Sequence, residues 1–235
     1  MNHLFGNPSR RSHEDSEHWM SVSDLMAGLM MVFLFISIAL MRQAYIERDK
    51  IIEVAEAYQQ NQVAIYDALV DEFEGDMKKW DAEIDKDNLA VLFKSPDVLF
   101  NIGSTRLTSQ FQEILQDFFP RYMGVLNNFR TSIDEVRIEG HTSSIWNHST
   151  SEDDAYFKNM ALSQGRTRAV LENVYRLNSV EIEKPWIKKH VAAVGFSSSR
   201  PIMDAAGNEI RERSRRVSFR VITNAETQIR KILQD

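Results

Sequence analysis

Residues 19–41 read W-M-S-V-S-D-L-M-A-G-L-M-M-V-F-L-F-I-S-I-A-L-M and contain a single charged residue, Asp24. The stretch is 23 residues long, and 17 uncharged residues follow Asp24. A helix of about 20 apolar residues spans the hydrocarbon core of a bilayer, so the sequence predicts a transmembrane helix over residues 19–41. A polar segment of 18 residues precedes it. The apolar run is too long for a signal-peptide core, which favours an uncleaved single-span anchor.

Asp24 is the candidate functional residue of this span. A charged side chain at the centre of a membrane helix costs roughly 2.5–3.5 kcal/mol on insertion scales. The presence of Asp24 in this span therefore indicates a functional role. The alternative is that Asp24 lies near the interface and only caps the helix. Burial favours the neutral carboxylic acid, so a buried Asp24 can take up and release a proton as its surroundings change.

Small residues lie on the same helical face as Asp24. Ala27 and Gly28 follow it by three and four positions, and they allow a second helix to approach closely. Further along, the helix offers only Ser37, which lies on the opposite side. A polar path to Asp24 therefore has to come from a partner protein.

Composition and residue spacing argue against several other classes of function. The chain has 235 residues and a net charge of -6 without an extended basic patch, which argues against a nucleic-acid partner. It has no cysteine, so it has neither a disulfide nor a thiolate metal site. The histidines lack metal-ligand spacing, no phosphate-binding loop is present, and no nucleophile has a placed base. We therefore expect no metal, no cofactor and no enzymatic activity.

Charge alone does not set the orientation of the span. Arg10 and Arg11 precede it, and Arg42, Arg48 and Lys50 follow it. The positive-inside rule is therefore nearly tied. The segment 1–18 is polar with mixed charge, and we expect it to be loosely ordered.

Residues 42–86 are expected to continue the helix. Steps of three and four alternate between apolar positions at first, as in a coiled-coil seam, and Gln62 falls on that seam. One interpretation is a single amphipathic helix lying on the folded domain. The other, which we favour, is a parallel two-chain coil leaving the membrane. The seam positions are Ile51, Ala55, Tyr58, Ile65, Leu69, Phe73, Met77, Trp80 and Ile84.

The segment 87–224 is expected to form a folded α/β domain, followed by a short helix at 225–235. Short apolar runs and period-two alternation predict its strands, and helical spacing predicts its helices. Strands that alternate with helices indicate an α/β sandwich, in which a mixed sheet has helices packed on it. The predicted strands lie at 89–93, 97–100, 136–138, 191–196 and 217–221, and the predicted helices at 108–128 and 157–177.

Three sequence motifs follow one another along this domain. I-E-G-H-T at 138–142 ends a strand in a turn, N-M-A-L-S-Q-G-R at 159–166 opens a helix, and R-E-R-S-R-R-V at 211–217 enters the last strand. They resemble the OmpA-like peptidoglycan-binding domain, whose pattern is G-H-T-D, then N-x-x-L-S-x-x-R-A, then R-x-x-N-R-R-V. The resemblance covers about residues 90–223.

This resemblance implies a site for the diaminopimelate of a peptidoglycan stem peptide. In it, the Arg166 guanidinium binds a ligand carboxylate through two N–H groups, with Asn159 as a polar partner and Leu162 as an apolar wall. His141 and Thr142 shape the adjoining turn. The alternative is that Arg166 pairs with an internal acid and His141 is only a turn residue. The implied site residues are His141, Thr142, Ser143, Asn159, Leu162, Ser163 and Arg166.

The chain departs from the family pattern at Ser143. The family has an aspartate there, so a carboxylate that would meet the ammonium group of the ligand is missing. The loop 144–158 is longer than usual and holds three acids, Glu152, Asp153 and Asp154. Any one of them could replace the missing aspartate.

The membrane segment carries a second resemblance. W-x(4)-D-L-M-A at 19–27 is similar to MotB-type stator subunits, in which a tryptophan precedes the ion-carrying aspartate. This resemblance implies a bacterial inner-membrane protein with a cytoplasmic N-terminus and a periplasmic domain that grips peptidoglycan. It also implies that Asp24 carries protons, or sodium ions, and that a ring of MotA-like subunits surrounds a dimer of this chain.

The N-terminal flank decides which stator family is most similar. It reads S-R-R-S-H-E-D-S-E-H-W at 9–19 and is mixed in charge, whereas flagellar MotB usually has a lysine-rich N-terminus. Together with the phenylalanine-rich span, it most resembles the ZorB family of Zorya antiphage systems, whose ring partner is ZorA. The alternatives are a flagellar MotB-type stator subunit and a passive peptidoglycan-anchoring membrane protein, which would have no need of Asp24.

Overall fold

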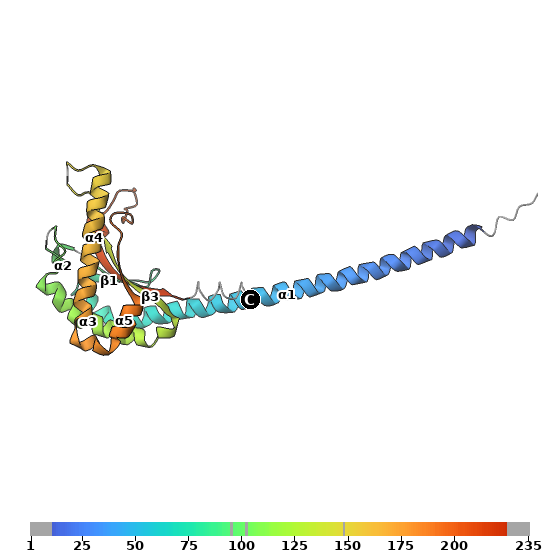
Figure 1. Cartoon of the computed structure of the whole chain (residues 1–235), viewed down its shortest axis with the longest axis horizontal. Coiled ribbons are helices and arrows are strands. Elements are labelled where there is room, and N and C mark those ends of the chain that lie inside the picture. The colour runs from blue at the N-terminus through green and yellow to red at the C-terminus, as the bar shows by residue number, and fades with distance from the viewer. Residues whose placement is uncertain (1–10, 95, 102, 148, 225–235) are drawn as a thin grey trace, which may run out of the picture. The chain divides into compact units, whose positions relative to one another are not determined.

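The structure, a computed structural model, describes residues 11–94, 96–101, 103–147 and 149–224 (Figure 1). The chain divides into two compact units, residues 1–53 and 54–235. Helix α1 (Arg11–Met77) has residues in both units. Residues 1–10 and the predicted C-terminal helix at 225–235 lie outside the described residues.

The first unit contains the apolar stretch. Among the described residues, one helix is long and apolar enough to cross a membrane, by length and composition, and it is the Val22–Met77 part of α1. Every side chain from Val22 to Met41 is exposed, including those of Leu25 and Phe33. A helix that is apolar on all sides is typical of a segment surrounded by lipid. Residues 11–18, which we expected to be loosely ordered, are helical.

The linker helix ends earlier than predicted. It stops at Met77 instead of continuing to residue 86, and Ile84 lies in strand β1 (Ala82–Asp85). A turn at residues 78–81 explains the difference, because Asp81 adopts a left-handed φ of 48° and the chain then pairs with β2 (Ala90–Phe93). Aspartate favours such turns over helix interiors.

The second half of the predicted seam packs into the folded domain. Ile65, Leu69 and Phe73 have no exposed surface and belong to the hydrophobic core. The interpretation as an amphipathic helix lying on its own domain is therefore correct for this part of α1. A two-chain coil remains a prediction for residues 42–64.

The domain contains one five-stranded mixed sheet, in the order β1-β2-β5-β3-β4. Strands β3 and β4 are parallel, and all other neighbours are antiparallel. Helix α4 crosses between the two parallel strands, as parallel pairing requires. The remaining strands are β2 (Ala90–Phe93), β3 (Ile133–His141), β4 (Val191–Gly195) and β5 (Arg216–Thr223).

Hydroxyl side chains cap the two longest helices that lie wholly within the domain. Thr108 Oγ1 accepts from the Phe111 N–H at 3.1 Å, and Ser151 Oγ accepts from the Asp154 N–H at 3.2 Å. Such caps satisfy N–H groups that have no partner inside the helix. The helices are α2 (Pro96–Leu99), α3 (Ser109–Asn127), α4 (Glu152–Tyr175), α5 (Lys184–His190) and α6 (Arg211–Ser214), with 3-10 turns η1 (Arg130–Ser132) and η2 (Asn178–Glu183).

The predicted strand at 97–100 is wrong. It forms the short helix α2, followed by a single bridge from Phe100 to Leu107. A four-residue apolar run does not distinguish a buried strand from a helical turn. Proline at the first helical position, here Pro96, favours the helix.

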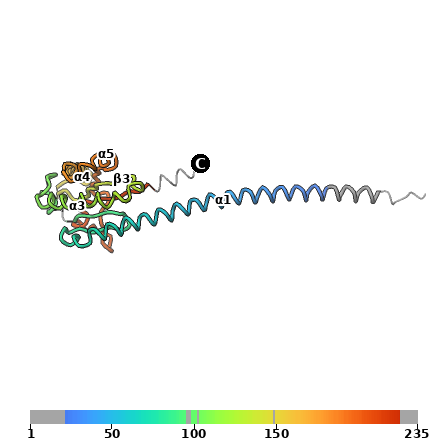
Figure 2. The backbone as a smooth tube through the Cα atoms, turned by 90° about the horizontal axis from the view of Figure 1, so that it is seen from below, coloured from blue at the N-terminus to red at the C-terminus, as the bar shows by residue number. Residues whose placement is uncertain are grey.

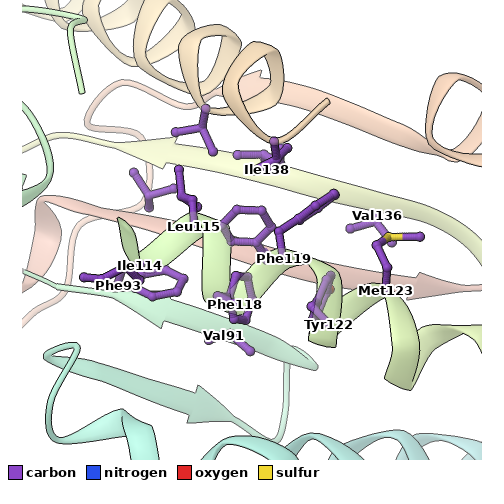
Figure 3. Packing of buried hydrophobic residues seen from close by; sticks show 14 of the residues in the cluster. Val91, Phe93, Ile114, Leu115, Phe118, Phe119, Tyr122, Met123, Val136 and Ile138 are labelled. Atoms are coloured by element: carbon purple, nitrogen blue, oxygen red, sulfur yellow. The ribbon is translucent and has the colours of Figure 1, made fainter. Parts of the chain in front are cut away.

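Helix α3 lies against one face of the sheet, where Leu115 and Phe119 lie toward Ile138 of β3 and Phe118 lies toward Val91 of β2 (Figure 3). Phe118 and Phe219 of β5 meet edge-to-face, with ring centroids 5.0 Å apart. Each large apolar side chain buried here contributes about 1.5–3 kcal/mol relative to an exposed one. The C-terminal part of α1 lies beside α3 (Figure 2).

Candidate functional site

The candidate site forms where β3 and β4 end. The Phe196 N–H donates to Gly140 O at 2.9 Å, and the Thr142 N–H donates to Ser197 O at 2.9 Å. The parallel pairing therefore continues past both strands. The two loops that follow them lie side by side, as expected from parallel strands with a common end.

Helix α4 is tied to both loops by polar side chains. Asn159 Nδ2 donates to Ser143 O at 3.1 Å. Ser163 Oγ accepts from the Ser197 N–H at 3.1 Å and donates to Met160 O at 3.0 Å. Asn159 and Ser163 are both buried, so these bonds satisfy groups that would otherwise be costly to desolvate.

Arg166 lies about two helical turns after Asn159 on α4 and is only 8% exposed. Its Nε–H donates to Ser104 O at 3.0 Å, and its guanidinium carbon lies 4.8 Å from the centroid of the Phe100 ring. These contacts fix the orientation of the guanidinium between α4 and the segment 97–107. Leu162, between Asn159 and Arg166 on the helix, is half-buried.

A buried acid–base pair lies beneath the turn that follows β3. His141 Nε2 is 3.5 Å from Glu139 Oε2, and the imidazole stacks on Phe196 with centroids 5.3 Å apart. Arg200 and Arg220 each place an Nη1 atom 3.8 Å from Glu139 Oε1. Glu139 and His141 are both about 4% exposed, so this pair supports the turn from inside the domain.

The protonation states of this pair follow from burial and charge. Burial lowers the pKa of His141, the charges of Arg216 and Arg200 lower it further, and Glu139 opposes them. For Glu139 burial raises the pKa, but the hydrogen bond and charge of His141 and the charges of Arg220 and Arg200 outweigh it, so the pKa is below its ordinary value. Near neutral pH, Glu139 is therefore an anion beside a neutral imidazole.

The structure places an unpredicted carboxylate next to Ser143. The Ser144 N–H donates to Glu209 Oε1 and Oε2 at 3.1 and 3.2 Å, and Ser144 Oγ donates to Oε2 at 2.6 Å. The two residues are 65 positions apart in sequence, so no local pattern indicated the contact.

The three acids that we considered as replacements for the missing aspartate lie at the start of α4. Glu152, Asp153 and Asp154 form the first turn of α4 and are exposed. Negative charge there interacts favourably with the positive end of the helix dipole.

The predicted ion-binding residues lie in the first unit, away in sequence from the turn that follows β3. Asp24, Ala27 and Gly28 lie at positions i, i+3 and i+4 of α1 and therefore share a face. A side chain added at Gly28 would meet nothing within 4 Å. Within the described part of the chain, no group of three or more His, Asp or Glu side chains converges as metal ligands would.

Comparison with known proteins gives the family. The chain is 57% identical to the Zorya protein ZorB of Escherichia coli over 235 residues, which is 100% of both chains. The chain belongs to the ZorB family. This membership confirms the resemblance to ZorB predicted from the sequence, and it agrees with the expectation that the chain is not an enzyme. No protein-family model matches the chain.

Several solved structures resemble this ZorB-family chain at low identity. The cell wall anchor of the T6SS from Pseudomonas aeruginosa matches with TM-score 0.45 and 23% identity, over 66% of this chain and 96% of that one. A MotB-like protein from Desulfovibrio vulgaris matches with TM-score 0.46 and 19% identity, over 73% and 94%. The periplasmic domain of Helicobacter pylori MotB matches with TM-score 0.40 and 17% identity, over 62% and 83%.

Proposed function

We propose that this chain is the peptidoglycan-anchored, ion-driven subunit of an inner-membrane motor complex that acts in antiphage defence. The observation that carries the proposal is the 57% identity, over the whole chain, to a Zorya protein. The N-terminus is cytoplasmic, α1 crosses the membrane, and the α/β domain is periplasmic. Two copies sit inside a ring of MotA-like subunits, which would be ZorA in a Zorya system.

In this proposal Asp24 carries the ion. It is the only charged residue between Trp19 and Met41, and Ala27 and Gly28 let a ring subunit approach the same face. A proton, or a sodium ion, that reaches Asp24 removes its charge, and release restores it. One charge crossing the membrane releases about 2.3 kcal/mol per 100 mV, which can drive stepwise rotation of the ring.

Replacing Asp24 tests ion transport separately from anchoring. We expect Asp24→Asn to abolish protection against phage, measured as plating efficiency, while the variant still copurifies with its ring partner. The matched control is Asp49→Asn. Asp49 lies beyond the apolar stretch, is exposed, and pairs with Arg48 at 3.0 Å. Full protection by Asp24→Asn would instead indicate a passive wall anchor.

The peptidoglycan part of the proposal rests on Arg166, Asn159 and Leu162. Arg166 is held by Ser104 O and the Phe100 ring, and Asn159 is held by Ser143 O. Fixed side chains lose little conformational entropy when a ligand binds. In the proposal, Arg166 receives a carboxylate of the peptide stem and Leu162 packs against its aliphatic part.

Sedimentation with purified sacculi tests this second part. We expect detergent-solubilised full-length chain to sediment with sacculi, and Arg166→Ala to lose at least tenfold in affinity. Arg168→Ala is the matched control, because Arg168 is an exposed arginine two positions along the same helix. Melting temperatures of both variants would show whether the buried substitution unfolds the domain. Equal sedimentation of wild type and a folded Arg166→Ala variant would remove the claim.

A further inference from the structure

We infer that Glu209 supplies the acidic half of the peptide-stem site and receives the ammonium group of a zwitterionic amino-acid side chain. This inference rests on the proposed binding of peptidoglycan. Glu209 lies outside the three sequence motifs. We assign to it the role of the family's aspartate, whose position is occupied here by Ser143. Glu209 is thus a specificity-determining residue for stem peptides that carry a free side-chain amine.

A small hairpin holds Glu209 in place. The Asp204 N–H donates to Asn208 O at 2.8 Å, and the Ile210 N–H donates to Ile202 O at 2.7 Å, on either side of the Met203–Glu209 bridge. A site on a hydrogen-bonded element positions its side chains better than an irregular loop does.

The tip of this hairpin is also well determined. Gly207 adopts a φ of 83°, which favours glycine. Asp204 Oδ1 accepts from the N–H groups of Ala206 and Asn208, each at 2.9 Å, and the Asn208 bond, the largest influence, helps to keep the pKa of Asp204 below its ordinary value. Near neutral pH the tip is therefore closed by an ionised carboxylate.

The Glu209 carboxylate retains capacity for a ligand. A carboxylate has about four lone-pair sites, and Ser144 supplies two donors, its backbone N–H and its hydroxyl. Glu209 is only partly buried, so an ammonium group can approach it. The bonds to Ser144 set its orientation in advance, which lowers the entropic cost of binding.

Two elements hold the turn that contains Ser143, and each of them carries one charged residue of the proposed site. Glu209 contacts the turn at Ser144, and Asn159 contacts it at Ser143 from α4, the helix that also carries Arg166. A ligand with both a carboxylate and an ammonium group can engage both charges. An anionic or neutral ligand can engage one at most, so the pair selects a zwitterion.

A cycle between protein and ligand tests this role. The probes are a muropeptide with meso-diaminopimelate and the same muropeptide acetylated on the side-chain amine, titrated against the full-length chain in detergent. We expect wild type to bind the free amine at least tenfold more tightly, which corresponds to about 1.4 kcal/mol. Glu209→Gln, which keeps an oxygen acceptor for Ser144, should lose this discrimination. Glu212→Gln, a nearby exposed control, should retain it.

The outcomes separate this inference from the proposed function. If wild type binds neither muropeptide and Arg166→Ala changes nothing, peptidoglycan binding fails and the inference fails with it. If wild type binds and Arg166→Ala weakens binding, but Glu209→Gln retains the preference for the free amine, only the role of Glu209 is overturned. Equal loss of both muropeptides in Glu209→Gln would assign Glu209 to holding the Ser144 turn, which also overturns the inference.

Discussion

Gly195 sets how closely α4 approaches the sheet at the site. A Cβ atom added there would lie 2.4 Å from the Gln164 backbone nitrogen and 2.6 Å from Ser163 Oγ. Its partner in the parallel pair, Gly140, would place a Cβ 2.9 Å from Ser163 O. These two glycines bring α4 near enough for Ser163 to receive the Ser197 N–H, so the site depends on the absence of two side chains.

Alanine at position 195 should therefore destabilise the domain. We expect Gly195→Ala to lower the free energy of unfolding by about 1–3 kcal/mol, because backbone atoms have to move. Gly124→Ala, at an exposed position in the last turn of α3 with nothing within 4 Å of the added atom, should raise it by up to about 0.5–1 kcal/mol. Thermal unfolding of the two variants in the same detergent gives the comparison. A stabilised Gly195→Ala variant would contradict the close approach described here.

Acid should destabilise the domain through His141. The pKa of His141 lies below its ordinary value of 6.5, so the unfolded chain binds a proton first as the pH falls below 6.5. Stability therefore falls from that pH down to the folded-state pKa, by about 1.4 kcal/mol for each pKa unit between the two. Glu139, whose pKa lies below 4.5, adds a further loss as the pH falls below that value.

Comparison with His141→Gln tests this assignment. The variant should show a flatter dependence of the unfolding midpoint on pH between 7 and 5, at the cost of a lower midpoint at pH 7. Identical slopes in the two proteins would show that another group controls acid stability.

At the scale of helices, Arg121 of α3 links α3 to the C-terminal part of α1. Arg121 Nε donates to Glu72 Oε1 at 2.5 Å, and Nη1 donates to Asp76 Oδ2 at 2.9 Å. The guanidinium also lies over the Phe73 ring, 4.9 Å from its centroid. The hydrogen bond to Glu72, the largest influence, raises the pKa of Arg121. Arg121 therefore fixes the end of α1 on the domain.

Removing Arg121 should loosen that end. We expect Arg121→Ala to reduce the free energy of unfolding by about 1–2 kcal/mol, since two charged partners lose their bonds at a partly exposed site. Arg176→Ala, which removes an exposed pair with Glu172, should cost less than about 0.5 kcal/mol. Hydrogen exchange of α1 amides around Glu72 would localise the effect. Equal costs for the two variants would show that Arg121 is only a surface ion pair.

Local pattern predicted strands β2 to β5 and helices α3 and α4, but not β1 or the short helices α2, α5 and α6. The alternation of Val136 and Ile138 predicted β3 because one face of the strand is buried. Strand β1 was missed because Ile84 continued a helical spacing, and only pairing with β2 shows that it is a strand. At the site, the motif positions 159–166 do meet the turn at 141–144. The sequence did not predict that Glu209 belongs to the site, because its contact with Ser144 joins two loops that are far apart in sequence.

For the molecule as a whole, the remaining prediction is a dimer formed along residues 42–64. The chain has no cysteine, so single cysteines can report on it without a background. Ala55→Cys and Tyr58→Cys lie on the predicted seam and should form disulfide-linked dimers in membranes. Gln60→Cys lies on the opposite side of a heptad and should not. Equal cross-linking at all three positions would exclude a defined coil.

The burial of Ile65, Leu69 and Phe73 has a mechanical consequence. The C-terminal part of α1 belongs to the core of the domain and is not a tether attached to its surface. Tension along residues 54–77 of α1 is therefore borne by shear across these side chains, together with the Arg121 contacts. Because several contacts share the load, they must fail together. The domain can resist pulling only as well as its core resists the withdrawal of one helix.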